Sequence, residues 1–444
     1  MNVLFVSLGC DKNLVDSEVM LGLLRDKGYS LTNEESEADV IVINTCCFIH
    51  DAKEESIQTI LEMAEYKKLG RLKVLLVTGC LAQRYREEIL KEIPEVDVVL
   101  GTTATDKIIS CIEEAMEGKQ VECYAPLDAL PLPDTNRVNT TGGYYSYLKI
   151  AEGCDKHCTY CIIPSLRGSY RSVPMERLVK EAEFLAEGGT KELILVAQET
   201  TVYGVDLYGK KMLPELLNRL CEIEGIEWIR LLYCYPEEIT KELIATMKNQ
   251  PKICHYLDLP IQHAADTVLK RMGRRTNRKE LDELISTLRK EIPDIALRTS
   301  LITGFPQETQ EEHEELMDFV AHAGFERLGV FTYSKEENTP AARMKGQITK
   351  KVKVSRQKEL MKLQQEVSKK RGEEKVGKTI RVMIEGKLPE DGIFIGRSYM
   401  DAPGVDGYVF VHSRDSYLSG EIIDVKITQA KEYDLVGEAV SELD

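Results

Sequence analysis

The sequence predicts an α/β protein of three units: a doubly wound parallel sheet, a partial six-unit (β/α) barrel resembling a TIM barrel, and a small antiparallel β-barrel. Three observations predict this. Apolar strand patterns alternate with helical patterns over residues 1–117 and again over 140–370. Residues 373–440 change to short strands separated by Gly, Pro and Asp turns. The length of 444 residues also exceeds what one hydrophobic core usually fills.

The composition, with 43% hydrophobic and 30% charged residues, is that of a globular protein. No apolar run of about eighteen residues and no signal-peptide pattern occurs, so we expect a cytoplasmic protein without a membrane partner. Twelve cysteines in that compartment favour metal or redox chemistry over disulfides.

The first unit, 1–117, has strand patterns that are apolar throughout, which predict a parallel sheet covered on both faces. The predicted strands are 2–9, 39–45, 73–79 and a shorter one at 96–101. The predicted helices between them are 16–27, 53–67 and 84–92.

Three cysteines of this unit, Cys10, Cys46 and Cys80, each lie within two residues of the end of one of the three long strands. Ligands of such sheets gather beyond the carboxyl ends of the strands. We therefore expect the three thiols to converge at one edge. The alternative is three buried structural cysteines, which behave as small hydrophobic residues. Cys47 is the rival of Cys46, which we prefer because it comes first after its strand.

A polar stretch rich in Pro and Thr, 126–143, indicates a linker, and we place the inter-domain linker at 118–139. A second βα series follows, which fits a partial barrel with its chemistry at the C-terminal strand ends. Its predicted strands are 146–153, 192–199, 228–236, 256–262, 296–304 and 327–334, and its helices include 175–187, 279–290 and 308–323.

A basic helical connector is predicted at 350–371, before the last unit. The short strands of that unit predict a small barrel of the OB type. They are 378–388, 393–400, 407–412 and 420–430.

The motif that carries the most specific chemistry is CxxxCxxC, formed by Cys154, Cys158 and Cys161 just after the first barrel strand. Three thiolates on one short loop can bind three corners of a 4Fe–4S cluster and leave the fourth iron open to a substrate. The alternative is a zinc site with His157 as fourth ligand. We favour the cluster, because adjacent residues of a short loop point in different directions and His157 adjoins Cys158.

This spacing, with Tyr160 before the last cysteine, resembles the radical S-adenosylmethionine enzymes over roughly 140–370. The resemblance implies that the open iron chelates S-adenosylmethionine and that reductive cleavage yields a 5′-deoxyadenosyl radical. It also implies a cofactor pocket built from polar residues at the strand ends. The candidates in this sequence are Gln198, Glu199, Gln262 and Arg298, with Gly304 and Glu308 in a glycine-containing fifth-strand motif.

For each of these pocket residues a cap or a buried hydrogen bond is the structural alternative. Arg298 is the candidate partner of the methionine carboxylate, because a guanidinium can bind it with two parallel hydrogen bonds. By the same chemistry as the loop, the N-terminal trio implies a second cluster with an open iron. The remaining cysteines are expected to be structural, namely Cys111, Cys123, Cys221, Cys234 and Cys254.

The three units together resemble the methylthiotransferases over almost the full chain, with a TRAM domain at the end. That family implies two 4Fe–4S clusters and two molecules of S-adenosylmethionine, one donating a methyl group to sulfur and the other generating the radical. It also implies a sulfur donor and an electron donor such as flavodoxin or ferredoxin. The catalytic groups are then the clusters and not an acid–base pair.

Two branches of that family differ in substrate. One modifies an adenosine of transfer RNA, and the other modifies the β-carbon of an aspartate in the small-subunit ribosomal protein S-twelve, free or on the ribosome. The stretch "SLGCDKNLVDSE" resembles the ribosomal-protein branch, although Glu199 stands where that branch commonly has aspartate. Residues 373–444 hold 8 Lys and Arg against 15 Asp and Glu, which disfavours a nucleic acid and suits a basic protein.

An alternative of another class is a non-enzymatic iron–sulfur or RNA-binding protein. A cluster loop at the mouth of a barrel disfavours this reading, because a simple electron carrier closes every iron with a protein ligand. The sequence therefore predicts a radical enzyme that acts on a protein.

Overall fold

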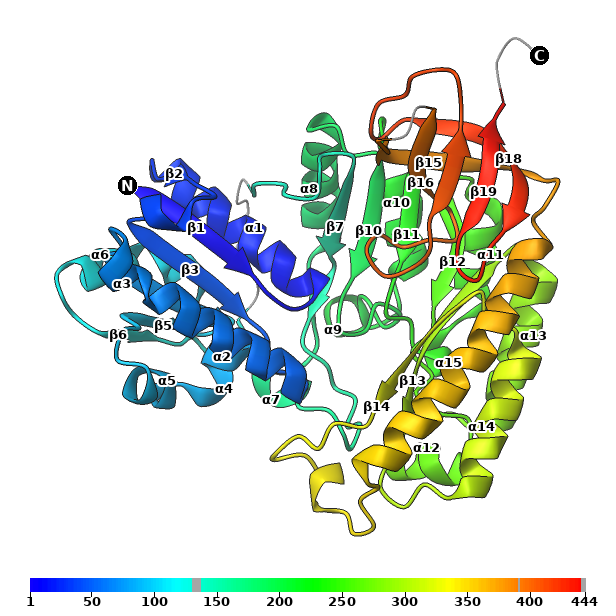
Figure 1. The fold of residues 1–444 in the computed structure, drawn as a ribbon, viewed down its shortest axis with the longest axis horizontal. Helices are drawn as coiled ribbons and strands as arrows, with labels where there is room; N and C mark the ends of the chain where they lie inside the picture. The colour runs from blue at the N-terminus through cyan, green and yellow to red at the C-terminus, as the bar shows by residue number, and fades with distance from the viewer. Residues whose placement is uncertain (130–136, 390–391, 441–444) are drawn as a thin grey trace.

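The computed structural model describes residues 1–129, 137–389 and 392–440, and part of the predicted linker lies outside them. Figure 1 shows the three units: the N-terminal sheet domain, the partial barrel in the middle and the small barrel at the C-terminal end. The predicted fold class is confirmed. No helix in these ranges is long and apolar enough to span a membrane.

The N-terminal domain is a parallel six-stranded sheet in the order β2-β1-β3-β4-β5-β6. One apolar core lies on each face, with α1 and α6 over one face and α2, α4 and α5 over the other. The strands are β1 Asn2–Ser7, β2 Ser30–Leu31, β3 Val40–Thr45, β4 Val74–Gly79, β5 Val98–Leu100 and β6 Val121–Cys123. The helices are α1 Asp11–Asp26, α2 His50–Ala64, α3 Tyr66–Leu69, α4 Cys80–Tyr85, α5 Glu87–Glu92 and α6 Ile108–Met116.

Helix α1 begins at Asp11, so the expected start at Asp16 is wrong. Gly9 turns the chain at a φ of +94°, and the carbonyl of Cys10 accepts the first helical hydrogen bond from Leu14. The first turn of the helix is polar and shows no apolar periodicity, so the sequence pattern did not indicate that it is helical. The residues after Cys10 are therefore helical.

The central unit is a parallel six-stranded sheet in the order β14-β13-β12-β11-β10-β7, which confirms the predicted partial barrel. Helices cover its outer face and share one core with it. The strands are β7 Tyr145–Lys149, β10 Glu192–Val196, β11 Trp228–Leu231, β12 Ile253–Asp258, β13 Ala296–Thr303 and β14 Arg327–Thr332. The helices after α6 are α7 Ile163–Arg167, α8 Met175–Glu187, α9 Val205–Tyr208, α10 Leu213–Cys221, α11 Lys241–Asn249, α12 Asp266–Met272, α13 Arg278–Glu291 and α14 Gln310–Ala323.

Helix α15, Lys350–Glu373, is the predicted connector and leads into a closed antiparallel-rich barrel ordered β15-β16-β17-β19-β18. Its apolar interior is continuous with the inner face of β10 to β13, so the small barrel packs into the open side of the large one. The strands are β15 Thr379–Lys387, β16 Ile393–Ser398, β17 Val409–His412, β18 Ile422–Ala430 and β19 Leu435–Ala439, of which only β19 was not predicted.

A buried ion network joins these two barrels. Glu192 accepts from Arg230 at 2.7 Å and from Arg397 of β16 at 2.8 Å, and all three side chains are fully buried. Two carboxylates of the small barrel, Asp401 and Asp406, also face barrel arginines. These two acidic groups therefore do not contribute to the exposed negative charge of the C-terminal unit.

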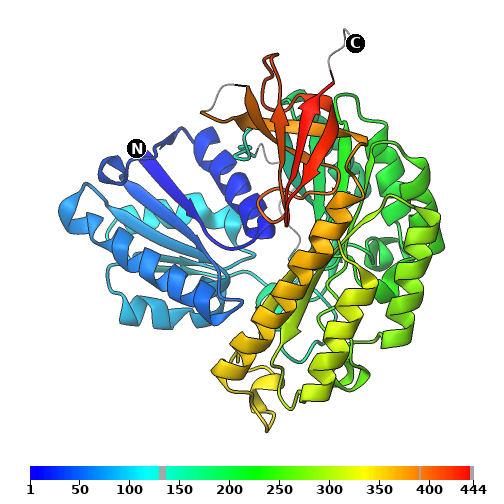
Figure 2. The same cartoon turned by 45° about the vertical axis from the view of Figure 1, so that its right-hand side comes forward.

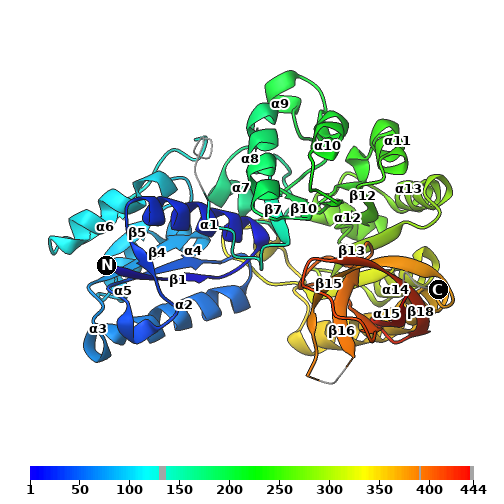
Figure 3. The same cartoon turned by 90° about the horizontal axis from the view of Figure 1, so that it is seen from above.

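The N-terminal domain contacts both edges of the open barrel (Figures 2 and 3). At the β7 edge, Asp16 of α1 forms a close ion pair with Lys149. At the β14 edge, Arg84 of α4 lies 3.2 Å from Glu336, in the loop that follows β14. The domain thus spans the gap between the two edge strands, which brings the carboxyl ends of both sheets to one interface.

Candidate functional site

The three N-terminal cysteines follow three adjacent strands. Cys10 precedes α1, Cys46 follows β3 directly and Cys80 begins α4, while β1, β3 and β4 are neighbours in the sheet. Burial raises the pKa of Cys46 to about 11 and also raises that of Cys80, and the nearness of Cys10 adds to both shifts. The topology therefore brings these residues together from positions far apart in the sequence.

Cys46 and Cys47 differ in their surroundings. A Cβ atom built at Gly9 would lie 3.2 Å from the Sγ of Cys46, so this thiol lies against the turn that carries Cys10. Cys47 is fully buried in the core between the sheet and its helices. This placement favours Cys46 as the third ligand.

The barrel trio lies on the loop after β8 (Ala151–Glu152), and two of its thiols accept backbone hydrogen bonds. The amide of Lys156 donates to the Sγ of Cys154, and the amide of Ile163 donates to the Sγ of Cys161, each at 3.4 Å. Burial raises the pKa of Cys154 to about 11 and that of Cys161 to about 12. Amide donors near sulfur suit a thiolate that is deprotonated by metal binding.

The zinc alternative is not supported. Zn–S bonds of about 2.3 Å would place tetrahedral thiolates about 3.8 Å apart. Within the described ranges, the only group of potential ligands within 4.8 Å of one another is the exposed set His50, Asp51 and Glu54. His157 is exposed and does not complete the loop. The three barrel thiols are therefore not all within 4.8 Å of one another, which suits a cluster in which each thiolate binds a different iron.

Both trios use the same dipeptide, Gly-Cys, at a sheet edge. Gly79 has a φ of +89°, and a Cβ there would overlap the backbone of Thr45; Gly153 has a φ of +79°, and a Cβ would overlap the carbonyl of Ser169. Only glycine fits both the left-handed backbone and the close approach. Neither glycine was predicted from the sequence, although the repeated dipeptide was a visible signal.

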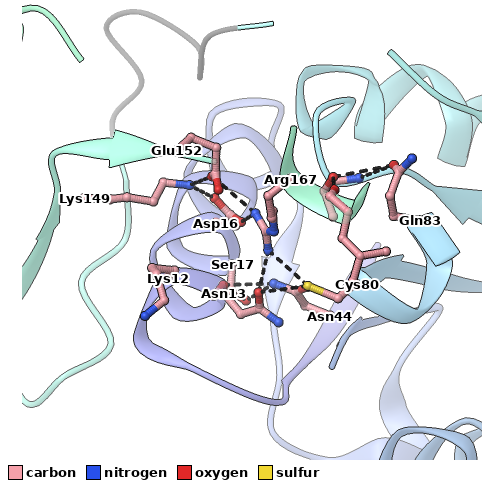
Figure 4. Close-up of polar contacts among 12 residues, drawn as sticks. Lys12, Asn13, Asp16, Ser17, Asn44, Cys80, Gln83, Lys149, Glu152 and Arg167 are labelled. Carbon is pink, nitrogen blue, oxygen red and sulfur yellow. Dashed lines mark hydrogen bonds and ion pairs between the residues drawn. The ribbon is translucent and has the colours of Figure 1, made fainter. Parts of the chain in front are cut away.

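Each trio also has one buried arginine at one thiol. Arg274 lies 3.9 Å from the Sγ of Cys158 and is stacked 4.4 Å from the ring of Tyr235. Arg167 lies 3.6 Å from the Sγ of Cys80 (Figure 4) and ends the short helix α7 that follows Cys161. Neither arginine was predicted, because both contacts join segments distant in sequence.

The polar residues expected in the cofactor pocket lie at or just after strands of the barrel. The amide nitrogen of Gln198 donates to Glu152 at 2.8 Å, while its buried Oε1 has no hydrogen-bond partner among the described residues. Glu199 is buried 3.7 Å from the Nζ of Lys156, and burial raises its pKa to about 7. Gln262 has a φ of +76° and bridges to Leu301. An unpartnered buried acceptor at Gln198 suits a cationic ligand group.

The other pocket candidates have protein partners. Arg298, the third residue of β13, lies 2.7 Å from Asp258 and 3.3 Å from Asp406. A Cβ at Gly304 would overlap the side chain of Lys353 of α15. Glu308 accepts from the amide of Phe305 and forms an ion pair with Arg356 at 2.8 Å.

The stretch after Cys10 forms contacts with the barrel. The hydroxyl of Tyr233 donates to Asp11 at 3.2 Å, and the ammonium of Lys12 lies over the Tyr233 ring. Although burial opposes the charge of Lys12, the Asp11 carboxylate raises its pKa. Asn13 accepts from Arg167 at 2.5 Å. These residues thus fix the N-terminal site against the barrel.

Models of three known families match the chain. The uncharacterised protein family UPF0004 matches residues 2–101, the radical S-adenosylmethionine superfamily matches 148–320, and the TRAM domain matches 376–440. The ribosomal protein uS12 methylthiotransferase RimO of Lachnoclostridium phytofermentans is 72% identical over 439 residues, which are 99% of this chain and 100% of the relative. The chain belongs to this family.

A second member, the RimO protein of Clostridioides difficile, is 49% identical and covers 98% of both chains. Among solved structures, the radical S-adenosylmethionine methyltransferase TsrM of Kitasatospora setae aligns with a TM-score of 0.56 at 13% identity, over 77% of this chain and 76% of that one. This likeness shows the shared fold. Family membership makes the chain a radical transferase that uses S-adenosylmethionine and iron–sulfur chemistry.

Proposed function

We propose that this protein, like the relatives named above, transfers a methylthio group to ribosomal protein uS12, at the β-carbon of an aspartate. The observation that carries the proposal is the meeting of two three-cysteine sites at one domain interface, in a chain that matches the family over its full length. A transferase that joins sulfur to an unactivated carbon needs both a sulfur site and a radical site within reach of one substrate.

In this proposal Cys154, Cys158 and Cys161 bind one 4Fe–4S cluster, and Cys10, Cys46 and Cys80 bind another. That list is supported by the convergence of each trio, the amide–sulfur hydrogen bonds and the buried arginine beside each. When bound, the clusters and S-adenosylmethionine supply the radical and the activated sulfur. The protein positions them and limits the access of water.

We assign three polar residues to the S-adenosylmethionine pocket. The buried Oε1 of Gln198 can accept from the methionine ammonium, with Glu199 after the same strand, β10, and Gln262 after β12, two strands away in the sheet. Arg298 and Gly304 stay candidates for the same pocket, and each also has a structural role. Arg298 already neutralises two carboxylates, and Gly304 allows the close approach of α15.

The partners follow from the chemistry. An electron donor such as flavodoxin or ferredoxin and a separate sulfur donor are required, and the reaction takes place in the cytoplasm, where ribosomal proteins are made. The net negative charge of both terminal units suits a basic protein substrate, although Asp401 and Asp406 are turned inward.

Mass spectrometry of uS12 from cells that lack this gene tests the proposal. We expect loss of the methylthio mass from one aspartate, restored by the intact gene and not by the Cys158→Ala variant. Unchanged uS12 together with missing methylthioadenosine in transfer RNA would instead assign the chain to the transfer-RNA branch.

A further inference from the structure

The buried guanidinium of Arg167 lies at the interface between the N-terminal domain and the barrel, next to Cys80 and Glu152 (Figure 4). Arg167 ends α7, six positions after Cys161, and its side chain is only 3% exposed. One terminal nitrogen donates to the Oδ1 of Asn13 at 2.5 Å and lies 3.6 Å from the Sγ of Cys80. The barrel loop that carries one trio thus reaches a thiol of the other.

The other terminal nitrogen of Arg167 is tied to two carboxylates. It donates to Asp16 of α1 at 2.7 Å and to Glu152 of β8 at 3.3 Å. Lys149 pairs with the same two carboxylates, so two cations balance two anions. Because every ionic partner is buried or nearly so, the guanidinium has little freedom to leave the sulfur.

The network continues to the second site. Glu152 stands two residues before Cys154, and its other oxygen accepts from Gln198, the residue we assign to the S-adenosylmethionine pocket. A continuous path of hydrogen bonds and ion pairs therefore runs from the Cys80 thiol through Arg167 and Glu152 to that pocket. Two other arginines in the described ranges contact a thiol but do not join this path: Arg274 contacts only its own domain, and Arg84, beside the Cys47 thiol, pairs with Glu336 and Glu337.

We propose that Arg167 is a positioning residue that orients Cys80 and raises the reduction potential of the cluster bound by the N-terminal trio. This inference rests on the proposed function. Hydrogen bonds and positive charge beside a cluster sulfur stabilise the reduced state, and outer partners of ligands fix ligand orientation. The same residue ties that orientation to the barrel loop, so the two sites keep one relative placement.

The test compares two variants with a matched control in the full-length protein, reconstituted anaerobically. Arg167→Gln removes the charge, and Arg167→Lys keeps it but cannot reach the thiol and both carboxylates at once. The control is Arg171→Lys, at a buried arginine four residues on. Among the described residues its donors reach only the carbonyls of Ala129, Arg167 and Ser169.

The readouts are the iron content and the midpoint potential of each cluster, followed by electron paramagnetic resonance during a redox titration. Addition of S-adenosylmethionine identifies the signal of the barrel cluster, since it binds there. In Arg167→Gln we expect the N-terminal cluster to become at least tenfold harder to reduce, about 59 mV for one electron, with the barrel cluster unchanged. Arg167→Lys should give a smaller shift of the same sign, and Arg171→Lys none.

Equal potentials in all four proteins at full iron content would overturn the inference, and so would equal shifts in Arg171→Lys and Arg167→Gln. If Arg167→Gln loses the N-terminal cluster, Arg167→Lys decides: a negative shift supports the inference, and no shift at full iron content contradicts it. Failure of the two-cluster part of the proposed function would look different, because the unmodified protein would then bind about four irons and not about eight.

Discussion

The two cysteine trios reach similar chemistry by different routes. Cys154, Cys158 and Cys161 lie within eight residues of one loop, whereas Cys10, Cys46 and Cys80 are brought together by strand order. The barrel site requires only that its own loop keeps its conformation. The second needs the whole parallel sheet and a barrel residue, Arg167, at one of its thiols. The N-terminal site should therefore be the more sensitive one to changes in domain packing.

The largest effect is expected at the loop. Cys158→Ala removes one of three cluster ligands, so both 5′-deoxyadenosine formation and methylthio transfer should fall by more than about 100-fold. Product analysis by liquid chromatography measures both. Cys221→Ala, outside both trios, is the control, and equal losses in the two variants would remove the distinction between ligand and structural cysteines.

The shared Gly-Cys turn gives a way to separate the sites without touching a thiol. Gly79→Ala forces a Cβ into the backbone of Thr45, so we expect loss of the N-terminal cluster, about half of the iron, while S-adenosylmethionine cleavage continues. Gly118→Ala is the control, because Gly118 also has a positive φ but no atom near the added Cβ. Iron analysis measures the loss of the cluster, and the cleavage assay measures the remaining activity. An iron content in Gly79→Ala equal to that of the unmodified protein would contradict the account.

The interface between the two barrels is remote from both trios and should affect stability alone. Arg230→Met leaves the fully buried Glu192 with one partner fewer, which should lower the free energy of unfolding by about 3–5 kcal/mol. Arg381→Ala breaks an exposed pair across the same interface, with Glu227, and should cost about 0–1 kcal/mol. Urea unfolding measures both changes in the free energy of unfolding. Similar losses in the two variants would show that burial does not determine how much an ion pair contributes at this interface.

The smallest expected effect is on the pH dependence of stability below pH 6.5. His263 of the barrel is fully buried, accepts from the amide of Ala265, and burial lowers its pKa to about 3. Between pH 6.5 and 3 the unfolded chain binds a proton that the folded chain does not, so stability is lost as pH falls, by up to about 1.4 kcal/mol per pH unit. His263→Gln should flatten this dependence in urea unfolding at pH 5 to 6.5, and an unchanged slope would assign it to other groups.

Much of the fold could be predicted from the spacing of apolar residues, because strands and helices such as 175–187 each show their own local periodicity. The N-terminal cysteines could be chosen because strand ends are visible in sequence, and the barrel cysteines because of their CxxxCxxC spacing. The contacts that complete the sites could not. Arg167 contacts Asn13 and Cys80, which are more than eighty positions away in the sequence. Arg298 forms an ion pair with Asp406 of another unit. Such pairs depend on how domains pack, which one sequence does not record.

The most direct test of the two-site account is one assay with two products, run on Cys80→Ala in parallel with the unmodified protein. With S-adenosylmethionine, a reductant and purified uS12, we predict that Cys80→Ala still forms 5′-deoxyadenosine and leaves uS12 without the methylthio mass. Methylthiolated uS12 formed by Cys80→Ala at the rate of the unmodified protein would contradict the account.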